Sequence, residues 1–254
     1  MENKIEYLKL FTTSEDYNSF VDSDTTNTPY IALCEDTEEV YFNTKKDTAG
    51  IEYVDLGLPN GTLWAKMNVG AAYTNDYGML FTWGGVEGAE VSMDGNGEFQ
   101  FGTEYTFGTN GNMIREGFYI EAQGGWQQYT KGDNFTKLQP KHDTARYHMG
   151  GSWHLPSKAQ VQELIDNCDS VLVEVSPNVT VMRYTSKING KYVDFPNCGY
   201  ATKDGMQTIT DNQLYLIWTN ELSDVYDTDA FILGANEILA TRRENGLFCR
   251  GVIG

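Results

Sequence analysis

Positively charged residues are scarce in this chain, which narrows its range of partners. The 254 residues include 36 Asp and Glu against 18 Lys and Arg, so the formal net charge is −18 at pH 7. A protein that binds nucleic acid or an anionic membrane concentrates Lys and Arg to neutralise phosphate. We therefore expect neither to be a partner, whereas the negative charge favours solubility and is compatible with cations.

Long apolar runs are also missing from the sequence. No stretch approaches the roughly 20 apolar residues that a membrane-spanning helix needs. The polar N-terminal stretch MENKIEYLKLFTTSEDY contains no apolar core of a signal peptide. We therefore expect a protein without a signal peptide that is synthesised and folds in a cytoplasm.

Cysteine is sparse as well. There are four cysteines, and no two of them form a Cys-x-x-Cys pair. Zinc sites and disulfide frameworks depend on paired or closely spaced cysteines. We therefore expect reduced, buried thiols at Cys34, Cys168, Cys198 and Cys249.

Aromatic residues and glycine are abundant by comparison. Hydrophobic residues make up 40% of the chain, which contains 26 Gly, 16 Tyr, 12 Phe and 5 Trp. This composition allows a sizeable core and indicates aromatic strands joined by many turns. We expect an α+β fold of mostly short antiparallel strands with one or two helices, and a small β-rich unit at the N-terminus.

Turn, cap and helix signals follow one another without conflict in residues 150–168, GGSWHLPSKAQVQELIDNC. The paired glycines allow an unusual turn, and Trp153 and Leu155 are apolar anchors. Ser157 is a good N-cap for a helix, although Gln160 makes the capping box a weak one. Apolar residues then recur at helical spacing. The residues expected on the buried face are Val161, Leu164 and Ile165.

The pattern of strand and turn signals in residues 1–46 predicts a separate small unit. The stretch IEYLKLFTT favours a strand, Ser14 is a suitable cap for a short helix, and PYIALCEDTEEVYFN predicts a hairpin that turns near Glu35–Thr37. Residues 47–50 are the expected hinge before a larger domain at 51–254. A unit of this size buries little surface alone, so we expect it to serve attachment or oligomerisation.

Turn signals divide residues 51–254 into strands. Pro59-Asn60-Gly61 favours a turn between two strands, Asn189-Gly190 predicts a hairpin, and further turns are expected at 234–236 and 245–246. Residues 85–135 have no helical period and are too long for a plain loop. This insertion is expected to be either a functional excursion or a set of short strands.

Signatures of catalysis are missing. The sequence contains no Ser-His-Asp arrangement or nucleophile elbow, and the turn at 108–112 is not followed by the Lys-Ser/Thr of a phosphate loop. His142, His148 and His154 recur every six residues, whereas zinc ligands usually lie closer together. We therefore expect a protein that is not an enzyme, with surface or turn histidines that hold no metal.

Two acidic clusters leave alternatives open. Residues 92–99, SMDGNGEF, are expected to form a solvated turn, because they lack the full calcium-loop pattern; calcium is the alternative. Asp224, Asp227 and Asp229 lie close to Tyr226, an arrangement that suits a sugar or calcium as well as a solvated loop. A glycosidase needs two carboxylates at a set separation, which a sequence does not show. No other cofactor is expected.

Landmarks from residue 51 onward resemble a known family. They are YVDLGLPNGTLWAKMNVGA, DYGMLFTWGG, LQPKHDTARYHMGGSWHLPSKAQVQELIDNC, FPNCGY, IWTNE and FCRGVIG. In this order they resemble the Fibrobacter succinogenes major paralogous domain, over about four fifths of the chain. The resemblance implies a C-type-lectin-like fold. Residues 1–46 resemble a short segment of Bacteroides-phage and related surface proteins, which implies a virion protein.

The resemblance also implies where a ligand binds. In that fold the C-terminal strands and their loops present the ligand face. The ligand contacts expected there are Tyr215, Thr219, Asn220, Glu221, Asp224, Tyr226, Asp229, Asn236 and Arg242. The residues expected to be structural are Trp64, Trp83, Gly151, Trp153, Pro156, Leu164, Trp218 and Arg250, the last as a hydrogen-bond donor.

The chain departs from the family's known activities at two motifs. A calcium-dependent sugar lectin carries Glu-Pro-Asn or Gln-Pro-Asp followed by Trp-Asn-Asp; residues 218–221, WTNE, only echo the second motif, and the Pro-containing partner is absent. Formylglycine-generating enzymes, which share the fold, need a reactive cysteine pair, and Cys249 has no neighbouring partner in the sequence.

The function expected from these observations is structural and adhesive. The chain is expected to be a head or tail fibre or decoration protein of a phage virion, in which a homo-oligomer presents the lectin-like domain to a host-surface glycan or protein. Residues 1–46 would contact other virion proteins. Two alternatives remain: a purely structural virion component without an external ligand, and a formylglycine-type oxidase or carbohydrate-active enzyme.

Overall fold

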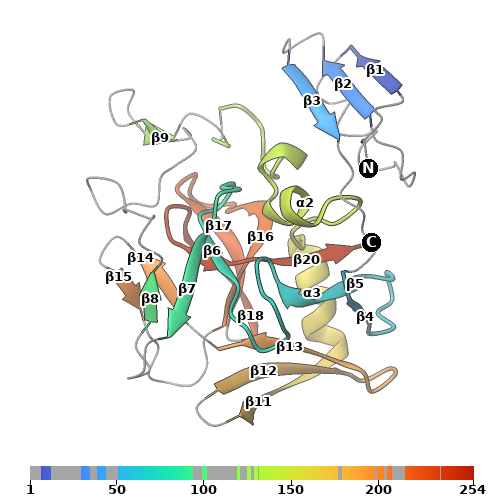
Figure 1. Cartoon of the computed structure of the whole chain (residues 1–254), viewed down its shortest axis with the longest axis vertical. Helices are drawn as coiled ribbons and strands as arrows, with labels where there is room; N and C mark the ends of the chain where they lie inside the picture. Colours follow the sequence, from blue (N-terminus) through green and yellow to red (C-terminus); the bar gives the residue numbers. More distant parts are fainter. Residues whose placement is uncertain are drawn as a thin grey trace.

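Strands account for most of the regular structure of this chain. The computed structural model describes residues 7–12, 30–34, 39–43, 51–93, 99–101, 119–120, 125–126, 129–130, 132–176, 179–197, 199–202, 205–207, 215–234 and 236–254. Within these ranges there are two α-helices, and the remaining regular elements are strands and one 3-10 helix (Figure 1). The mostly β, α+β class expected from the aromatic strands and turn signals is therefore confirmed.

Three strands form a sheet near the N-terminus: β1 (Tyr7–Phe11), β2 (Tyr30–Cys34) and β3 (Glu39–Asn43). β2 runs parallel to β1 and antiparallel to β3, with Cys34 opposite Glu39. This pairing confirms the predicted first strand and hairpin. The helix predicted from Ser14, the turn at Glu35–Thr37 and the hinge at 47–50 lie outside the described residues.

A second sheet brings the two ends of residues 51–254 side by side. It contains β4 (Tyr53–Asp55), β5 (Leu63–Asn68) and β20 (Arg250–Ile253), in the order β20-β5-β4, and both pairs are antiparallel. The turn predicted between β4 and β5 is present. The Gly61 N–H donates to the Leu58 carbonyl, and Gly61 has a φ of 75°, which glycine adopts readily.

The largest sheet has seven strands in the order β18-β17-β16-β19-β6-β7-β8. Its C-terminal part comprises β16 (Leu216–Leu222), β17 (Asp229–Gly234), β18 (Glu237–Arg242) and β19 (Leu247–Phe248). The other part comprises β6 (Met79–Phe81), β7 (Ala89–Met93) and β8 (Phe99–Phe101). Neighbours are antiparallel apart from β16 and β19. β17 and β18 pair with Gly234 opposite Glu237, and the turn predicted at 245–246 joins β18 to β19.

Short strands occupy part of the described residues of the predicted insertion. Besides β7 and β8, they include the antiparallel pair β9 (Tyr119–Ile120) and β10 (Gly125–Trp126). The alternative of a set of short strands is confirmed for these residues. The acidic stretch at 94–98 and the turn at 108–112 lie outside the described residues.

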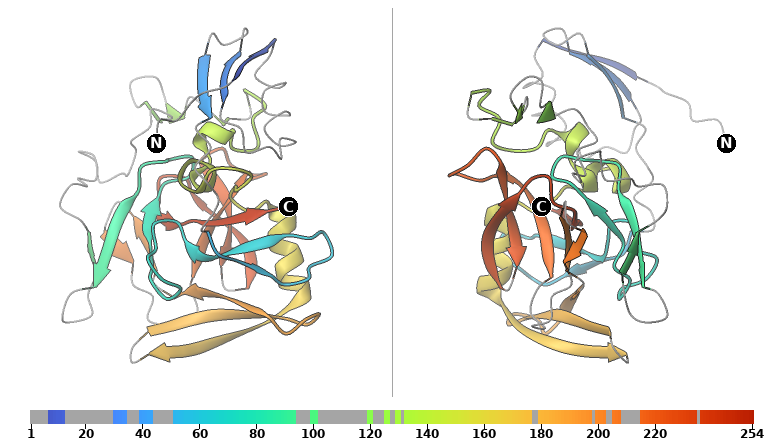
Figure 2. Two further views of the ribbon diagram at one scale, coloured as in Figure 1. Left: turned by 45° about the vertical axis from the view of Figure 1, so that its right-hand side comes forward. Right: turned by 90° about the vertical axis from the view of Figure 1, so that its left-hand side faces the viewer.

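A long antiparallel hairpin follows the central helix. β11 (Cys168–Ser176), β12 (Val179–Ser186) and β13 (Tyr192–Pro196) pair in order, and β14 (Tyr200–Thr202) pairs with β15 (Gly205–Gln207). The predicted Asn189-Gly190 turn joins β12 to β13, with Gly190 at φ 73°. β11 and β12 extend along one end of the body in each view (Figure 2).

The predicted central helix is α3 (Lys158–Asn167), and it packs against β16, β17 and β18 (Figure 1). Its capping box is complete, because the Ser157 hydroxyl accepts the Gln160 N–H and the Gln160 side chain accepts the Ser157 N–H. Val161 and Leu164 are fully buried as expected, and Ile165 is half-buried. The other helical elements are η2 (Pro140–His142) and α2 (Thr144–Met149).

Glu163 is buried on the same helix, which its apolar pattern does not predict. Its carboxylate accepts hydrogen bonds from the Asn60 N–H and the Thr62 hydroxyl. A buried carboxylate is stable when such donors replace water. Glu163 therefore fastens the β4–β5 turn to α3.

Tryptophans join the two halves of the large sheet. All four predicted structural tryptophans are almost fully buried: Trp64, Trp83, Trp153 and Trp218. The Trp218 indole N–H donates to the Phe81 carbonyl at 2.7 Å, and the Trp83 indole N–H donates to the Thr219 carbonyl at 2.8 Å. Buried indole N–H groups usually find such acceptors, and these two bonds fix β16 against β6 and the residues that follow it. In the described part of the chain, no helix is long and apolar enough to cross a membrane.

Candidate ligand-binding site

The predicted ligand residues lie on β16, β17, β18 and their connections, but they do not form one cluster. β17 has six residues, so its two ends lie about 17 Å apart at a strand rise of about 3.4 Å per residue. One end carries Asn220, Glu221, Asp224, Tyr226, Asp229 and Arg242, and the other carries Tyr215 and Asn236. The expected ligand residues therefore divide between two ends of the sheet, and the larger group is the candidate site.

Tyr215 and Thr219 are not surface residues, contrary to the prediction. They are 1% and 0% exposed, and Tyr215 belongs to a cluster of buried core side chains. The Tyr215 hydroxyl bonds to the Tyr184 hydroxyl and accepts the Asn236 N–H. The Thr219 hydroxyl donates to the Phe231 carbonyl at 2.9 Å. Both side chains therefore hold the sheet together and do not reach a ligand at the surface.

Glu221 is already engaged within the fold. Its carboxylate accepts the N–H of Lys158, the first residue of α3, at 3.1 Å, where the helix dipole favours a negative charge. Its other neighbour is the Lys137 amino group at 3.5 Å. The Asn220 backbone bonds to Pro156 and Leu138. The WTNE motif thus positions α3, and Glu221 borders the candidate site with its charge balanced.

The loop between β16 and β17 presents the exposed part of the site. Val225 and Tyr226 are 60% and 63% exposed, and Asp224 reaches the Lys158 amino group at 3.2 Å. The Ser223 N–H donates to the Asp229 carbonyl at 2.9 Å, and the Asp229 N–H donates to the Tyr226 carbonyl at 3.1 Å. This backbone bonding gives the loop a defined conformation while the side chains of Asp224, Val225 and Tyr226 face solvent.

Arg243 supports this loop from beneath. Its guanidinium is fully buried, lies 4.9 Å from the Trp83 ring centre, and donates to the Asp227 and Tyr129 carbonyls at 2.9 and 3.0 Å. The Arg243 N–H also donates to the Thr228 carbonyl. Burial lowers the pKa of Arg243 to about 10, so it stays charged at neutral pH. This residue was not predicted from the sequence, because nothing in TRREN (241–245) distinguishes a buried arginine from an exposed one.

The charged side chains of the site have separate partners. Asp229 accepts the Thr228 hydroxyl at 2.8 Å, and Arg242 pairs with Glu244 at 2.8 Å. Among the described residues, no three His, Cys, Asp or Glu side chains converge as metal ligands would. The structure therefore offers hydrogen-bonding and aromatic groups at this end of the sheet.

The histidines also bond to separate groups. The His142 ring contacts the Tyr129 hydroxyl, the His148 ring bonds to the Val86 carbonyl at 2.7 Å, and the His154 ring bonds to the Leu155 carbonyl at 2.8 Å. Each ring is only partly buried. His142 lies in η2, His148 in α2 and His154 in a β-bridge to Val252, so none of them stands in the exposed surface or turn position that was expected.

Arg250 and the described cysteines are interior residues. Arg250 is fully buried and donates to Asn68, Ala65 and Asp194, the donor role expected for it. Cys168 and Cys249 are free, buried thiols. Burial raises the pKa of the Cys168 thiol to about 11 and also raises that of Cys249. Both thiols are therefore protonated at neutral pH. Their burial agrees with the buried thiols expected from the sequence; the side chains of Cys34 and Cys198 lie outside the described residues.

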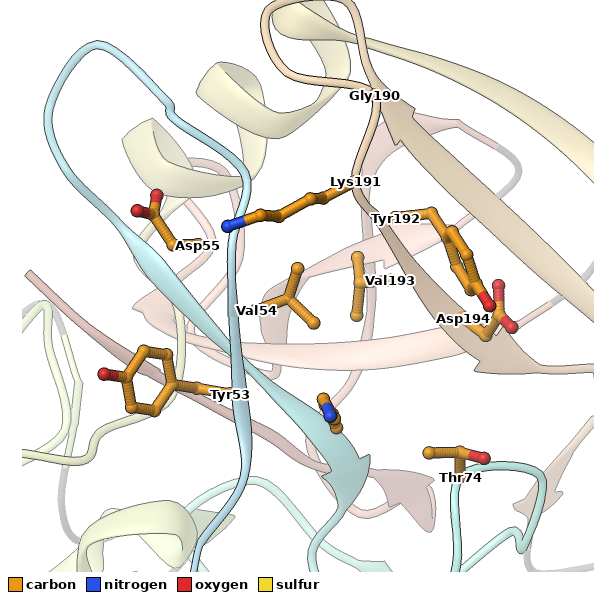
Figure 3. Close-up of a pocket in the computed structure, with 10 residues that line it drawn as sticks. Tyr53, Val54, Asp55, Thr74, Gly190, Lys191, Tyr192, Val193 and Asp194 are labelled. Carbon is orange, nitrogen blue, oxygen red and sulfur yellow. The ribbon is translucent and has the colours of Figure 1, made fainter.

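A groove that the sequence analysis missed lies elsewhere on the molecule, between β4–β5 and the β12–β13 hairpin (Figure 3). Its volume is about 610 Å³. The residues that line it are Tyr53, Val54, Asp55, Lys66, Thr74, Gly190, Lys191, Tyr192, Val193 and Asp194. Each half is visible in the sequence as a short strand with an outward tyrosine, YVD at 53–55 and YVD at 192–194. Their proximity is not visible there.

Comparison with known proteins finds no match to this chain among protein-family models, curated proteins or solved structures.

Proposed function

We propose that this chain is a structural protein of a phage virion, a head or tail fibre or decoration protein, whose lectin-like domain binds a host-surface glycan or protein. The observation that carries the proposal is the ordered loop at 223–228. It presents Val225 and Tyr226 to solvent while its backbone is hydrogen-bonded to β17 and to Arg243. A loop that is ordered before it binds loses little conformational entropy on binding.

The arrangement of residues 51–254 supports a lectin-like domain. Its first and last strands, β4 and β20, lie on either side of β5. The Gly150-Gly151 turn, with both glycines at positive φ, precedes the buried Trp153 and the helix α3. These features occur at the motifs that carry the family resemblance.

The N-terminal unit completes the proposal. Residues 1–46 attach the chain to other virion proteins or to further copies of itself, and residues 51–254 project from them. A closed symmetric oligomer multiplies a weak individual site into a higher avidity. The strand pairing of β1, β2 and β3 supports a folded attachment unit.

The oxidase alternative receives no support from the thiols. A formylglycine-type oxidase needs an accessible, activated cysteine. Cys249 is fully buried, and its pKa is raised by that burial. The geometry of Cys249 therefore speaks against the oxidase alternative.

Binding to host cells tests the proposal. Fluorescently labelled protein carrying Asp224→Ala and Tyr226→Ala is compared with wild type and with Tyr147→Ala, which removes an equally exposed tyrosine on α2. We expect the double variant to lose at least tenfold in cell binding and the Tyr147 variant to match wild type. Equal binding by all three proteins would refute the loop as the ligand site, and absence of wild-type binding would favour the purely structural alternative.

A further inference from the structure

We propose that the groove between β4–β5 and β13 binds a neutral oligosaccharide, at a site separate from the loop at 223–228. The groove combines two exposed aromatic rings with charged and hydroxyl side chains that line one open cavity (Figure 3). Ligand sites characteristically pair apolar surface with a few polar groups that fix orientation. The inference does not depend on the virion proposal.

The aromatic residues are the first reason for choosing a sugar. Tyr53 on β4 is 52% exposed and Tyr192 on β13 is 48% exposed. A tyrosine offers a flat apolar ring with a polar tip. Sugar rings have a face of C–H groups and a rim of hydroxyls, so they match such a ring better than a purely apolar ligand does. Tyr53 and Tyr192 come from the two walls of the groove, with Val54 and Val193 between them (Figure 3), so only a chain of sugar units would reach both rings.

The position of Tyr192 is set by its neighbours before any ligand arrives. The Arg183 guanidinium carbon lies 3.8 Å from the Tyr192 ring centre. Arg183 is in turn held by two hydrogen bonds to the Asp194 carboxylate, at 2.8 and 2.7 Å. A stacked arginine that is also bidentate to a carboxylate has few alternative conformations. The ring is therefore presented in a fixed orientation.

The two walls of the groove are also fastened to each other. The Asn189 side chain donates to the Asp55 carbonyl at 3.0 Å, and the Ser186 hydroxyl donates to the Leu56 carbonyl at 2.6 Å. These bonds tie the β12–β13 turn to the end of β4. The groove consequently keeps its width without a ligand, which lowers the entropic cost of binding.

The charges of the groove indicate a neutral ligand. Its lining includes two carboxylates, Asp55 and Asp194, and two amines, Lys66 and Lys191, so the lining has no net charge. Asp194 is already paired with Arg183, and Lys66 is paired with Glu52 at 2.7 Å. The whole chain carries −18, which repels an anionic glycan. Charged groups that are already paired can still donate hydrogen bonds to sugar hydroxyls or accept them.

The experiment measures binding to a printed array of neutral, sialylated and sulfated glycans. The glycans that bind are then titrated against the protein in solution. The folded wild type is compared with Tyr53→Ala and Tyr192→Ala, and with Tyr192→Phe, which keeps the ring. We expect binding to neutral glycans that each alanine variant weakens at least tenfold and Tyr192→Phe weakens far less. Tyr226→Ala, in the loop at 223–228, should leave this binding unchanged.

Three results would overturn the proposal: no neutral glycan bound, binding only to anionic glycans, or neutral-glycan binding that persists in both alanine variants. Because Tyr53 and Tyr192 are half-exposed, the variants should unfold at the same temperature as wild type, which separates lost binding from lost structure. Cell binding by the Asp224 and Tyr226 double variant tests only the loop at 223–228, and glycan binding by the Tyr53 and Tyr192 variants tests only the groove. Either proposal can therefore be refuted without the other.

Discussion

Two buried arginines connect segments that are far apart in the sequence. Arg243 donates to the Asp227 and Tyr129 carbonyls, and Arg250 donates to Asn68, Ala65 and Asp194. Burial lowers the pKa of Arg250 to about 9, yet its guanidinium remains charged at neutral pH. The cost of removing these cations from water is offset only because carbonyl oxygens replace the solvent.

Arg250→Met should destabilise the protein strongly. Methionine fills much of the same volume, but the acceptors on Ala65, Asn68 and Asp194 lose their donor. A buried acceptor left without a partner costs about 1–3 kcal/mol, so we expect the free energy of unfolding to fall by about 3 kcal/mol in urea titration. The exposed Arg242→Met is the control, with a change within about 0.5 kcal/mol. Equal losses in the two variants would contradict this account.

The thiols of Cys168 and Cys249 should resist alkylation in the folded protein. With its pKa raised to about 11, the Cys168 thiol is ionised in only about one molecule in a thousand at pH 8. Burial raises the pKa of Cys249 as well. Iodoacetamide labelling and peptide mass mapping at pH 8 should find both unmodified until urea is added. Rapid labelling of Cys249 in the native protein would revive the oxidase alternative.

A turn can require glycine because of its backbone conformation or because a Cβ would clash with a neighbour, and two variants distinguish these reasons. Gly61 and Gly78 have nearly the same φ, 75° and 77°. A Cβ at Gly61 meets nothing within 4 Å, whereas a Cβ at Gly78 lies 2.5 Å from the Val69 carbonyl oxygen. Gly61→Ala should therefore cost about 1 kcal/mol from backbone strain alone, and Gly78→Ala about 3 kcal/mol because steric overlap is added. Equal unfolding free energies in urea would show that the clash is relieved by relaxation.

The helix α3 should lose stability when its cap is removed. Ser157→Ala deletes the acceptor for the Gln160 N–H, and such a change costs about 1 kcal/mol. The loss in unfolding free energy should not exceed this value, because Glu221 still accepts the Lys158 N–H at the same helix end. Urea titration measures it, with Gln162→Ala on the exposed face as the control. If Ser157→Ala lowers the unfolding free energy no more than the control does, the Glu221 carboxylate alone is sufficient to cap the first N–H groups of α3.

At the scale of the whole molecule, the proposed division into an attachment unit and a binding domain makes a direct prediction. A fragment of residues 51–254 should unfold cooperatively, because β4, β5 and β20 join both of its ends. It should be monomeric by light scattering, whereas the full chain should be a homo-oligomer. A monomeric full chain, or an oligomeric fragment, would move oligomerisation away from residues 1–46.

Local chemistry alone determined much of the fold. The Asn60-Gly61 and Asn189-Gly190 turns, the Ser157 cap and the apolar face of α3 depend on residues within a few positions of one another. Such signals survive in a linear sequence because they act over one turn of chain. The predominance of strands followed from the same turn signals and from the aromatic composition.

The tertiary structure decided which residues are accessible and which are neighbours. Tyr215 and Thr219 lie beside and within the IWTNE motif, but their side chains are buried, and the length of β17 separates Asn236 from the loop at 223–228. The groove forms because Asn189 and Ser186 bond to the end of β4, more than a hundred residues earlier. Burial and long-range contacts depend on how the strands pack, and nothing near those residues in the sequence specifies that packing.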